Sequence, residues 1–161
     1  MEMDDGFSSR APAASGLRPV VLVTGGSSGI GLALAHGFAA LGRDLFLVAR
    51  DAGRLRQAAD HIAASTAASV DTFACDLSQP GATALLLEAV HCTGACIDVL
   101  VNCAGAAVLG PLGSREGERT SASLRLNVVA TTELMQACLP GMLERGRGGV
   151  LTVASLAGTR R

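Results

Sequence analysis

The sequence contains no lysine, no tyrosine and no tryptophan, and aromatic residues make up 2% of it. All 13 of its basic residues are arginine. Chemistry that needs a lysine amine or a tyrosine hydroxyl is therefore excluded, because an arginine side chain cannot give up its proton in a protein. The formal net charge of −1 gives no excess of positive charge for nucleic acid or an anionic membrane surface.

Long apolar runs and a secretory signal are also missing. No apolar stretch approaches the length needed to cross a bilayer, and residues 1–5 are acidic where a signal peptide is basic. The five cysteines contain no C-x-x-C pair, although Cys92 and Cys96 share a possible helix face with His91. No second ligand pair stands nearby, which favours buried thiols in a reducing cytosol over a zinc site. We expect a cytoplasmic protein without a metal centre.

Short apolar runs recur along the chain after a small-residue leader, residues 1–17, which we expect to be disordered. Near-continuous apolar runs mark parallel strands that are covered on both faces. The segment Val70–Ala74 is weaker, because Asp71 and Thr72 interrupt it. We predict strands at Val20–Val23, Leu45–Val48, Val70–Ala74, Ile97–Val101 and Val150–Val153.

Helical spacing fills the segments between these runs. Ile30, Leu34, Phe38 and Leu41 fall on one stripe of the first helix, and Leu55, Ala58, Ala59 and Ile62 on one stripe of the second. Pro80 is expected to open the third helix. A fourth helix is predicted from Ser121 to Arg145, kinked or restarted at Pro140. The alternation predicts an α/β fold, a doubly wound parallel sheet in residues 18–161.

A glycine-rich loop, Thr24-Gly25-Gly26-Ser27-Ser28-Gly29-Ile30-Gly31, joins the first strand to the first helix. Glycines let backbone amides approach a pyrophosphate, and the start of a helix offers unpaired N–H groups and the positive end of its dipole. Glycines also make ordinary turns. The position between a buried strand and an amphipathic helix favours phosphate binding.

The spacing G-x-x-x-G-x-G in this loop resembles the cofactor loop of the short-chain dehydrogenases/reductases, and the resemblance extends over residues 19–158. It implies a Rossmann-type sheet of strand order 3-2-1-4-5, incomplete at its C-terminal side. It also implies that the loop contacts a dinucleotide. The cofactor-binding residues implied in the loop are Thr24, Gly25, Ser27, Ser28, Gly29, Ile30 and Gly31.

The end of the second strand indicates which dinucleotide is bound. Ala49 stands where NAD-preferring members of the family carry an acidic residue, and Arg50 follows it. A basic residue here receives the 2′-phosphate of NADP. Asp51 comes one step too late and is expected to cap the next helix. Arg50 is otherwise a solvated loop residue, but we favour NADP(H), with Ser27 as a second phosphate contact.

Two further motifs follow the third and fourth strands. Asp76 and Leu77 resemble the family's pair that lies against the adenine ring, although Asp76 is also a plausible turn former. Asn102-Cys103-Ala104-Gly105 resembles the family's Asn-Asn-Ala-Gly, with Cys103 in place of the second Asn. The resemblance implies that Asn102, Ala104 and Gly105 lie at the cofactor.

Two residues are candidates for catalysis. Asn127 lies in the apolar part of the fourth helix, where a buried amide needs hydrogen bonds. It is either a structural residue bonded to backbone or, as the resemblance implies, the holder of a water in a proton relay. Ser155 follows the fifth strand, and the resemblance implies that it binds the substrate oxygen. His36, His61 and His91 fall within helical segments and are read as ordinary surface or boundary residues.

The family's catalytic Tyr and Lys lie on the helix that follows this Ser, which would fall past Arg161, so we interpret the motif as cut off. The first hypothesis is an NADP(H)-dependent oxidoreductase for a small carbonyl or alcohol substrate, whose 161-residue chain is catalytically incomplete. The second is an inactive NADP-binding module that associates with a complete homologue or with itself. A methyltransferase is disfavoured by the loop spacing and by Arg50 where its cofactor needs an acidic residue.

Overall fold

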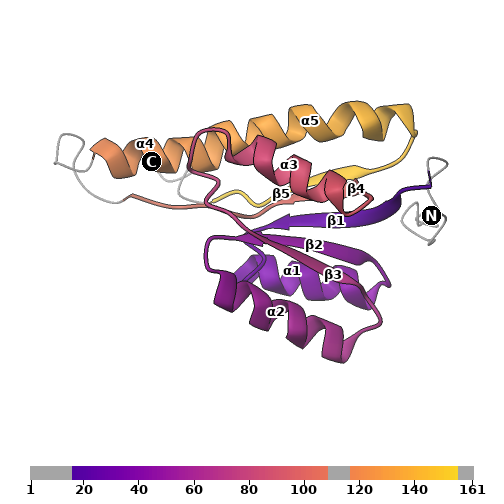
Figure 1. Cartoon of the computed structure of the whole chain (residues 1–161). Coiled ribbons are helices and arrows are strands. Elements are labelled where there is room, and N and C mark those ends of the chain that lie inside the picture. The colour runs from indigo at the N-terminus through magenta and orange to yellow at the C-terminus, as the bar shows by residue number, and fades with distance from the viewer. Residues whose placement is uncertain (1–15, 109–116, 156–161) are drawn as a thin grey trace, which may run out of the picture.

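A computed structural model, in which residues 16–108 and 117–155 are described, contains a five-stranded parallel sheet (Figure 1). The strand order is β3-β2-β1-β4-β5, which confirms the predicted doubly wound α/β architecture. The predicted leader lies outside the described residues, except for Gly16 and Leu17. The strands are β1 (Arg18–Thr24), β2 (Asp44–Ala49), β3 (Val70–Ala74), β4 (Ala95–Asn102) and β5 (Gly149–Thr152).

Helices cover both faces of this sheet (Figure 1). The helices α1 (Gly29–Ala40) and α2 (Ala52–Ser65) pack on one face. The other face carries α3 (Ala82–Cys92) and a long helical segment. That segment consists of α4 (Gly117–Leu124), a π-helical turn η1 (Arg125–Ala130) and α5 (Thr131–Glu144).

The central strands supply most of the core, as their apolar runs predict. In β1, Val20 and Leu22 face the cluster that contains α3 and α5, while Val21 and Val23 face the cluster that contains α1. The alternation follows from the two-residue period of a strand. The charged residue of the weaker strand β3, Asp71, has a partner, because the guanidinium of Arg18 pairs with it and also lies 3.5 Å from Asp44.

The predicted stripe of α1 is wrong at both of its ends, while Leu34 and Phe38 are partly buried against the core. Ile30 and Leu41 are exposed, and the buried positions are Gly31, Ala35 and Ala39. Small residues face the sheet because α1 approaches the loop after β1 closely, and larger side chains such as Phe38 pack from the flanks. The predicted stripe of α2 is confirmed, since Leu55, Ala58, Ala59 and Ile62 are all buried.

Both proline-based expectations are corrected. Helix α3 begins at Ala82 rather than at Pro80, after Gly81 in a left-handed conformation with φ of 77°. Helix α5 does not restart at Pro140 but continues through it to Glu144. Pro140 and Gln136 are both exposed, so water can satisfy the Gln136 carbonyl that loses a backbone donor. The departure from α-helical geometry lies earlier, at η1.

Among the described residues, none of the helices combines the length and the apolar character that a membrane span requires.

Candidate nucleotide-binding site

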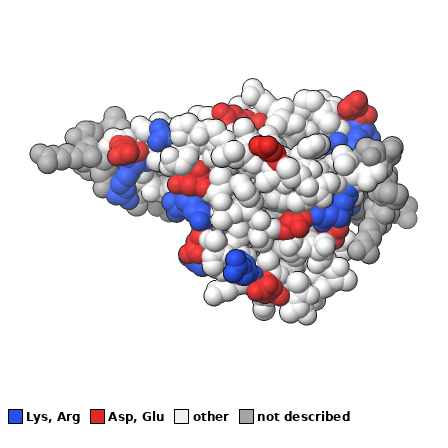
Figure 2. All heavy atoms as spheres, in the orientation of Figure 1, with Lys and Arg blue, Asp and Glu red and all other residues white. Residues whose placement is uncertain are grey.

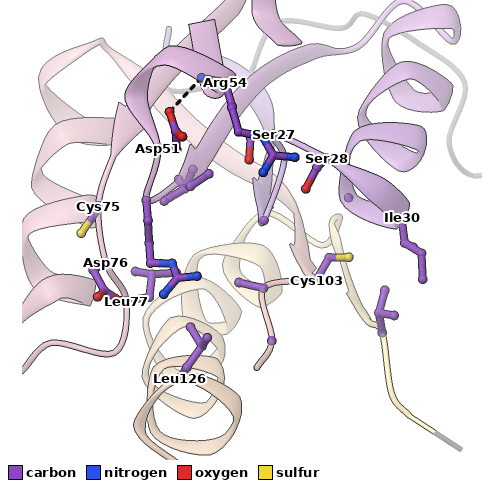
Figure 3. Close-up of a pocket in the computed structure, with 18 residues that line it drawn as sticks. Ser27, Ser28, Ile30, Asp51, Arg54, Cys75, Asp76, Leu77, Cys103 and Leu126 are labelled. Atoms are coloured by element: carbon purple, nitrogen blue, oxygen red, sulfur yellow. Dashed lines mark hydrogen bonds between the residues drawn. The ribbon is translucent and has the colours of Figure 1, made fainter. Parts of the chain in front are cut away.

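A cavity of about 370 Å³ opens at the carboxyl ends of the strands (Figure 3). Ligands of doubly wound sheets bind at this edge, where the loops after the strands converge. The structure brings most of the predicted cofactor residues together in its wall. These residues are Gly25, Ser27, Ser28, Ile30, Gly31, Arg50, Asp76, Leu77, Ala104 and Gly105.

The glycine-rich loop is packed so tightly that side chains are excluded at two positions. A Cβ atom on Gly31 would lie 2.3 Å from the carbonyl oxygen of Gly25. Gly25 has a φ of 71°, and a Cβ there would lie 3.0 Å from the backbone nitrogen of Ala104. These contacts bring the loop, the start of α1 and the end of β4 together. The backbone is therefore open to a close ligand on the cavity side.

The two helices that begin at this cavity differ in how they are capped. Asp51 caps α2, because its Oδ1 accepts a hydrogen bond from the backbone N–H of Arg54 at 3.0 Å, as the sequence predicts. Ser28 precedes α1 but makes no such side-chain bond. The first N–H groups of α1 therefore keep their capacity to donate, and the exposed Ser28 hydroxyl lines the cavity. An uncapped helix start of this kind can hold a phosphate group.

Positive charge is supplied from the other side of the cavity by Arg50 and Arg54, while Ala49 contributes no acidic group. Arg50 directly follows β2, and Arg54 lies in the first turn of α2. Figure 3 shows the guanidinium of Arg54 beside the hydroxyl groups of Ser27 and Ser28. Two guanidinium groups and two hydroxyls can bind a phosphate through charge-assisted hydrogen bonds.

Asp76 forms a tight turn after β3. Its Oδ1 accepts hydrogen bonds from the backbone N–H of Ser78 at 3.0 Å and from the Ser78 hydroxyl at 2.8 Å. Burial raises the pKa of Asp76, but hydrogen bonds from Ser78 and Gln79 and the charge of Arg50 outweigh it, so this pKa lies below its ordinary value. The carboxylate is therefore ionised at neutral pH. It lines the cavity beside the buried Leu77.

The end of β4 is fixed to the end of β1 by one hydroxyl group. Thr24 donates to the carbonyl of Val101 at 3.3 Å, and its oxygen accepts from the backbone N–H groups of Cys103 and Ala104, each at 3.0 Å. Thr24 thus shapes the site without lining the cavity. Asn102 is buried and also lies outside the lining, as does Gly29. Burial raises the pKa of the Cys103 thiol, which is therefore neutral in the wall.

Asn127 is exposed, contrary to the expectation of a buried amide. It lies in η1, and its side chain binds the loop after β4. Its Nδ2 donates to the carbonyl of Ala106 at 2.8 Å, and its Oδ1 accepts from the Ala106 N–H at 3.0 Å. Its Nδ2 also lies 3.2 Å from the Ser123 hydroxyl. Of the two readings from the sequence, these contacts correspond to the structural Asn that is bonded to backbone.

Ser155 follows β5 and is exposed, while the neighbouring Val153 lines the cavity. The residues expected to complete the Ser155 motif, 156–158, lie outside the described part of the chain. The three histidines lie on α1, α2 and α3, and none of them lines the cavity. The rings of His36 and His61 contact each other edge to face, with centroids 5.1 Å apart.

Several wall residues were not predicted from the sequence. Arg54 is the most informative of them. Its signal in the sequence is its position three residues after the cap Asp51, in the first turn of the helix that begins at the cavity. Val48, Ala49, Asp51 and Cys75 follow from the ends of predicted strands. Leu126 comes from η1, and its place in the wall had no local signal in the sequence.

Comparison with known proteins places this geometry among related enzymes. A family model described as short chain dehydrogenase matches residues 19–161. Human 17-beta-hydroxysteroid dehydrogenase type 1 is 39% identical over 147 residues, which cover 88% of this chain and 44% of the human protein.

Two solved structures show the same fold. The L-sorbose reductase from Gluconobacter frateurii, complexed with NADPH and L-sorbose, is 35% identical with a TM-score of 0.79 and 85% coverage of this chain. A short-chain dehydrogenase from Sphingobium yanoikuyae, in complex with NADPH, is 34% identical with a TM-score of 0.80 and 88% coverage. The chain covers 52% and 55% of these two structures, so it spans about half the length of its relatives. The chain belongs to the short-chain dehydrogenase/reductase family.

Proposed function

We propose that this chain is the NADP(H)-binding part of an oxidoreductase that acts on a carbonyl or alcohol substrate. The observation that carries the proposal is a single cavity that joins the uncapped start of α1 to two arginines after β2. NADP(H) needs both the free helix start and a basic residue, because its pyrophosphate binds helix N–H groups and its 2′-phosphate binds a basic side chain. The NADPH complexes of the two related structures support the same cofactor.

The wall of the cavity fits this cofactor from end to end. The loop Gly25–Gly31 holds the pyrophosphate, with Ser28 and the N–H groups of α1 as donors. Arg50 and Arg54, together with Ser27, hold the 2′-phosphate. Asp76 and Leu77 receive the adenine end. Ala104 and Gly105 offer their backbone to the nicotinamide end, and the Thr24 hydroxyl holds the N–H of Ala104.

NADP(H) supplies or accepts a hydride when it is bound. The chain's own residues then have to bind the substrate oxygen and manage a proton. We assign the substrate contact to Ser155, at the carboxyl end of β5, and the support of a water to Asn127. The side chain of Asn127 is engaged with Ala106. These contacts fix the loop after β4, and the water-holding role rests on the resemblance to the family.

A second candidate is an NADP-binding module without activity of its own. Its starting point is that Tyr and Lys, which the family's proton transfer uses, do not occur among these 161 residues. The five cysteines are all free thiols, which supports a reducing compartment such as the cytoplasm for either candidate. Figure 2 shows acidic and basic side chains interspersed on one face of the molecule. This face has no continuous positive patch that would attract nucleic acid.

Cofactor preference tests the proposal. We expect the chain to bind NADPH more tightly than NADH in a fluorescence titration. The variants R50D and R54D replace a phosphate partner with a repulsive charge, and a charge-assisted contact contributes about 1.5–3 kcal/mol. Each variant should therefore narrow the preference for NADPH by about tenfold or more.

The variant R56D is the matched control, because Arg56 is exposed on α2 and does not line the cavity. It makes the same charge change two residues from Arg54 and should leave the preference for NADPH intact. Equal binding of NADPH and NADH by the parent chain would contradict the proposal. An equal effect of R56D would show that overall charge, rather than a defined phosphate contact, sets the preference.

Turnover separates the two candidate functions. Without Tyr and Lys, the 161-residue chain at saturating NADPH should not reduce a ketone above the rate of a protein-free blank. Supplying a family-like C-terminal segment should restore reduction if the chain is part of an oxidoreductase, and S155A should then lower kcat. Failure of restoration, with NADPH binding intact, would favour the inactive module. Reduction by the bare chain would overturn the requirement for Tyr and Lys.

A further inference from the structure

Three consecutive residues of the π-helical turn η1 contact the cavity and two of the loops that border it. The Nε of Arg125 donates a hydrogen bond of 2.7 Å to the carbonyl of Ser78, in the loop after β3. Leu126 lines the cavity itself, as Figure 3 shows below Leu77. Asn127 binds the backbone of Ala106, in the loop after β4. A π-helical turn is wider than an α-helical one, and such turns occur frequently at functional sites.

The carbonyl that Arg125 binds belongs to the turn that orients Asp76. Ser78 is buried, with 7% of its surface exposed. Its N–H and hydroxyl both donate to Oδ1 of Asp76. The carbonyl of Ser78 therefore binds the guanidinium of Arg125, while its N–H and hydroxyl bind the carboxylate of Asp76. A change in the position of Ser78 must therefore move Asp76 as well.

A second contact between the same elements limits how the loop can move. The hydroxyl of Thr83, at the start of α3, donates a hydrogen bond to the carboxylate of Glu133 on α5. Segment 78–83 is therefore attached to the η1–α5 segment at both of its ends. Thr83 secures the beginning of α3, and the Arg125 bond secures the turn that reaches the cavity. Arg125 does not line the cavity, so its hydrogen bond acts on a ligand through Ser78 rather than by direct contact.

We infer that Arg125 is a positioning residue for the adenine end of the cofactor. Its bond to the Ser78 carbonyl holds the Asp76–Leu77–Ser78 turn in the geometry that receives the adenosine half of NADP(H). The inference rests on the proposed cofactor binding. It predicts that loss of the Nε donor weakens binding of the adenosine half, although Arg125 makes no contact with it.

Two neutral variants of equal length separate this bond from the charge of Arg125. In R125Q, the amide nitrogen stands as many bonds from the backbone as the Nε of arginine, so a donor is retained. In R125M, a methyl group takes this place and no donor remains. We would titrate each variant with NADPH and with 2′,5′-ADP, which carries only the adenosine half, by calorimetry.

R125M should bind 2′,5′-ADP about tenfold more weakly than the parent, and NADPH more weakly by the same factor, since one hydrogen bond from a charged donor is lost. R125Q should stay within about twofold of the parent for both ligands, because it keeps the donor. Equal affinities of the parent and R125M for 2′,5′-ADP would overturn the inference. An equal loss in both variants would also overturn it, because the charge alone would then matter.

Thermal unfolding completes the test. If R125M no longer unfolds cooperatively while R125Q does, the bond serves folding of the chain and the positioning role is overturned. A parent chain that binds neither NADPH nor 2′,5′-ADP would instead refute the proposed function. Tight binding by the parent with an unchanged R125M would refute the inference about Arg125 alone.

Discussion

Gly31 sets how closely α1 approaches the loop after β1. A methyl group at this position would lie 2.3 Å from the Gly25 carbonyl oxygen, so the G31A variant must push the helix away from the loop. Overpacking of this kind costs about 1–3 kcal/mol. We expect G31A to lower the free energy of unfolding by this amount in urea denaturation. It should also weaken NADPH binding, because the N–H groups of α1 move with the helix.

Gly37 provides a matched control on the same helix. A Cβ atom there meets nothing within 4 Å. Alanine is the better helix former, so G37A should raise the free energy of unfolding by about 0.5–1 kcal/mol and leave NADPH binding unchanged. A G31A variant as stable as G37A would show that α1 tolerates a side chain at the loop, against the packing described here.

Single residues of the site were predictable where they follow a strand within three residues. Ser27, Arg50 and Asp76 stand after three successive strands, and parallel strands bring their carboxyl ends to one edge. The bond between Arg125 and Ser78 joins residues 47 positions apart. Its formation depends on how η1 lies against the loop after β3, and no local sequence pattern predicts that arrangement.

At the scale of elements, strands were easier to predict than helix faces. A buried parallel strand is apolar on both sides, so its position can be read without knowing its neighbours. The buried side of α1 depends instead on the distance between helix and loop. Gly31 and Ala35 face the sheet because only small residues fit there, whereas a hydrophobic stripe would place Ile30 and Leu41 inside.

The long helical segment shows the same dependence on context. Pro140 lies on its exposed side, where water can replace the lost backbone bond, so α5 continues through it. The actual irregularity, η1, contains no proline or glycine. Its extra residue per turn places Arg125, Leu126 and Asn127 on the cavity and its loops, a tertiary requirement that helix propensity does not register.

At the scale of the whole molecule, the two sides of the sheet are unequally covered. Val150 of β5 packs against the core beneath α5. The next residue, Leu151, points to the opposite face by strand alternation and is 40% exposed. On the long helical segment, Leu124, Val128 and Leu143 are each more than half exposed. Within the described residues, β5 pairs only with β4 and leaves a free edge.

A free edge with apolar side chains recruits a further strand or another chain. We therefore expect the 161-residue chain to self-associate at low micromolar concentration and to unfold at a modest temperature. Light scattering coupled to size exclusion would measure the mass. The variant L151K places a charge on the edge strand and should shift the chain toward the monomer, because a lysine must be desolvated when a second strand pairs there.

The variant A64K is the control for added charge, since Ala64 is exposed on α2, far from β5 in the fold (Figure 1). It should leave the mass distribution of the parent unchanged. If L151K and A64K reduce association equally, net charge is responsible rather than the edge. If L151K has no effect while L143E produces monomers, the apolar side of α5 is the contact. A parent chain that is monodisperse, monomeric and cooperatively folded would contradict the expectation. Neither the free edge of β5 nor the apolar side of α5 would then drive association.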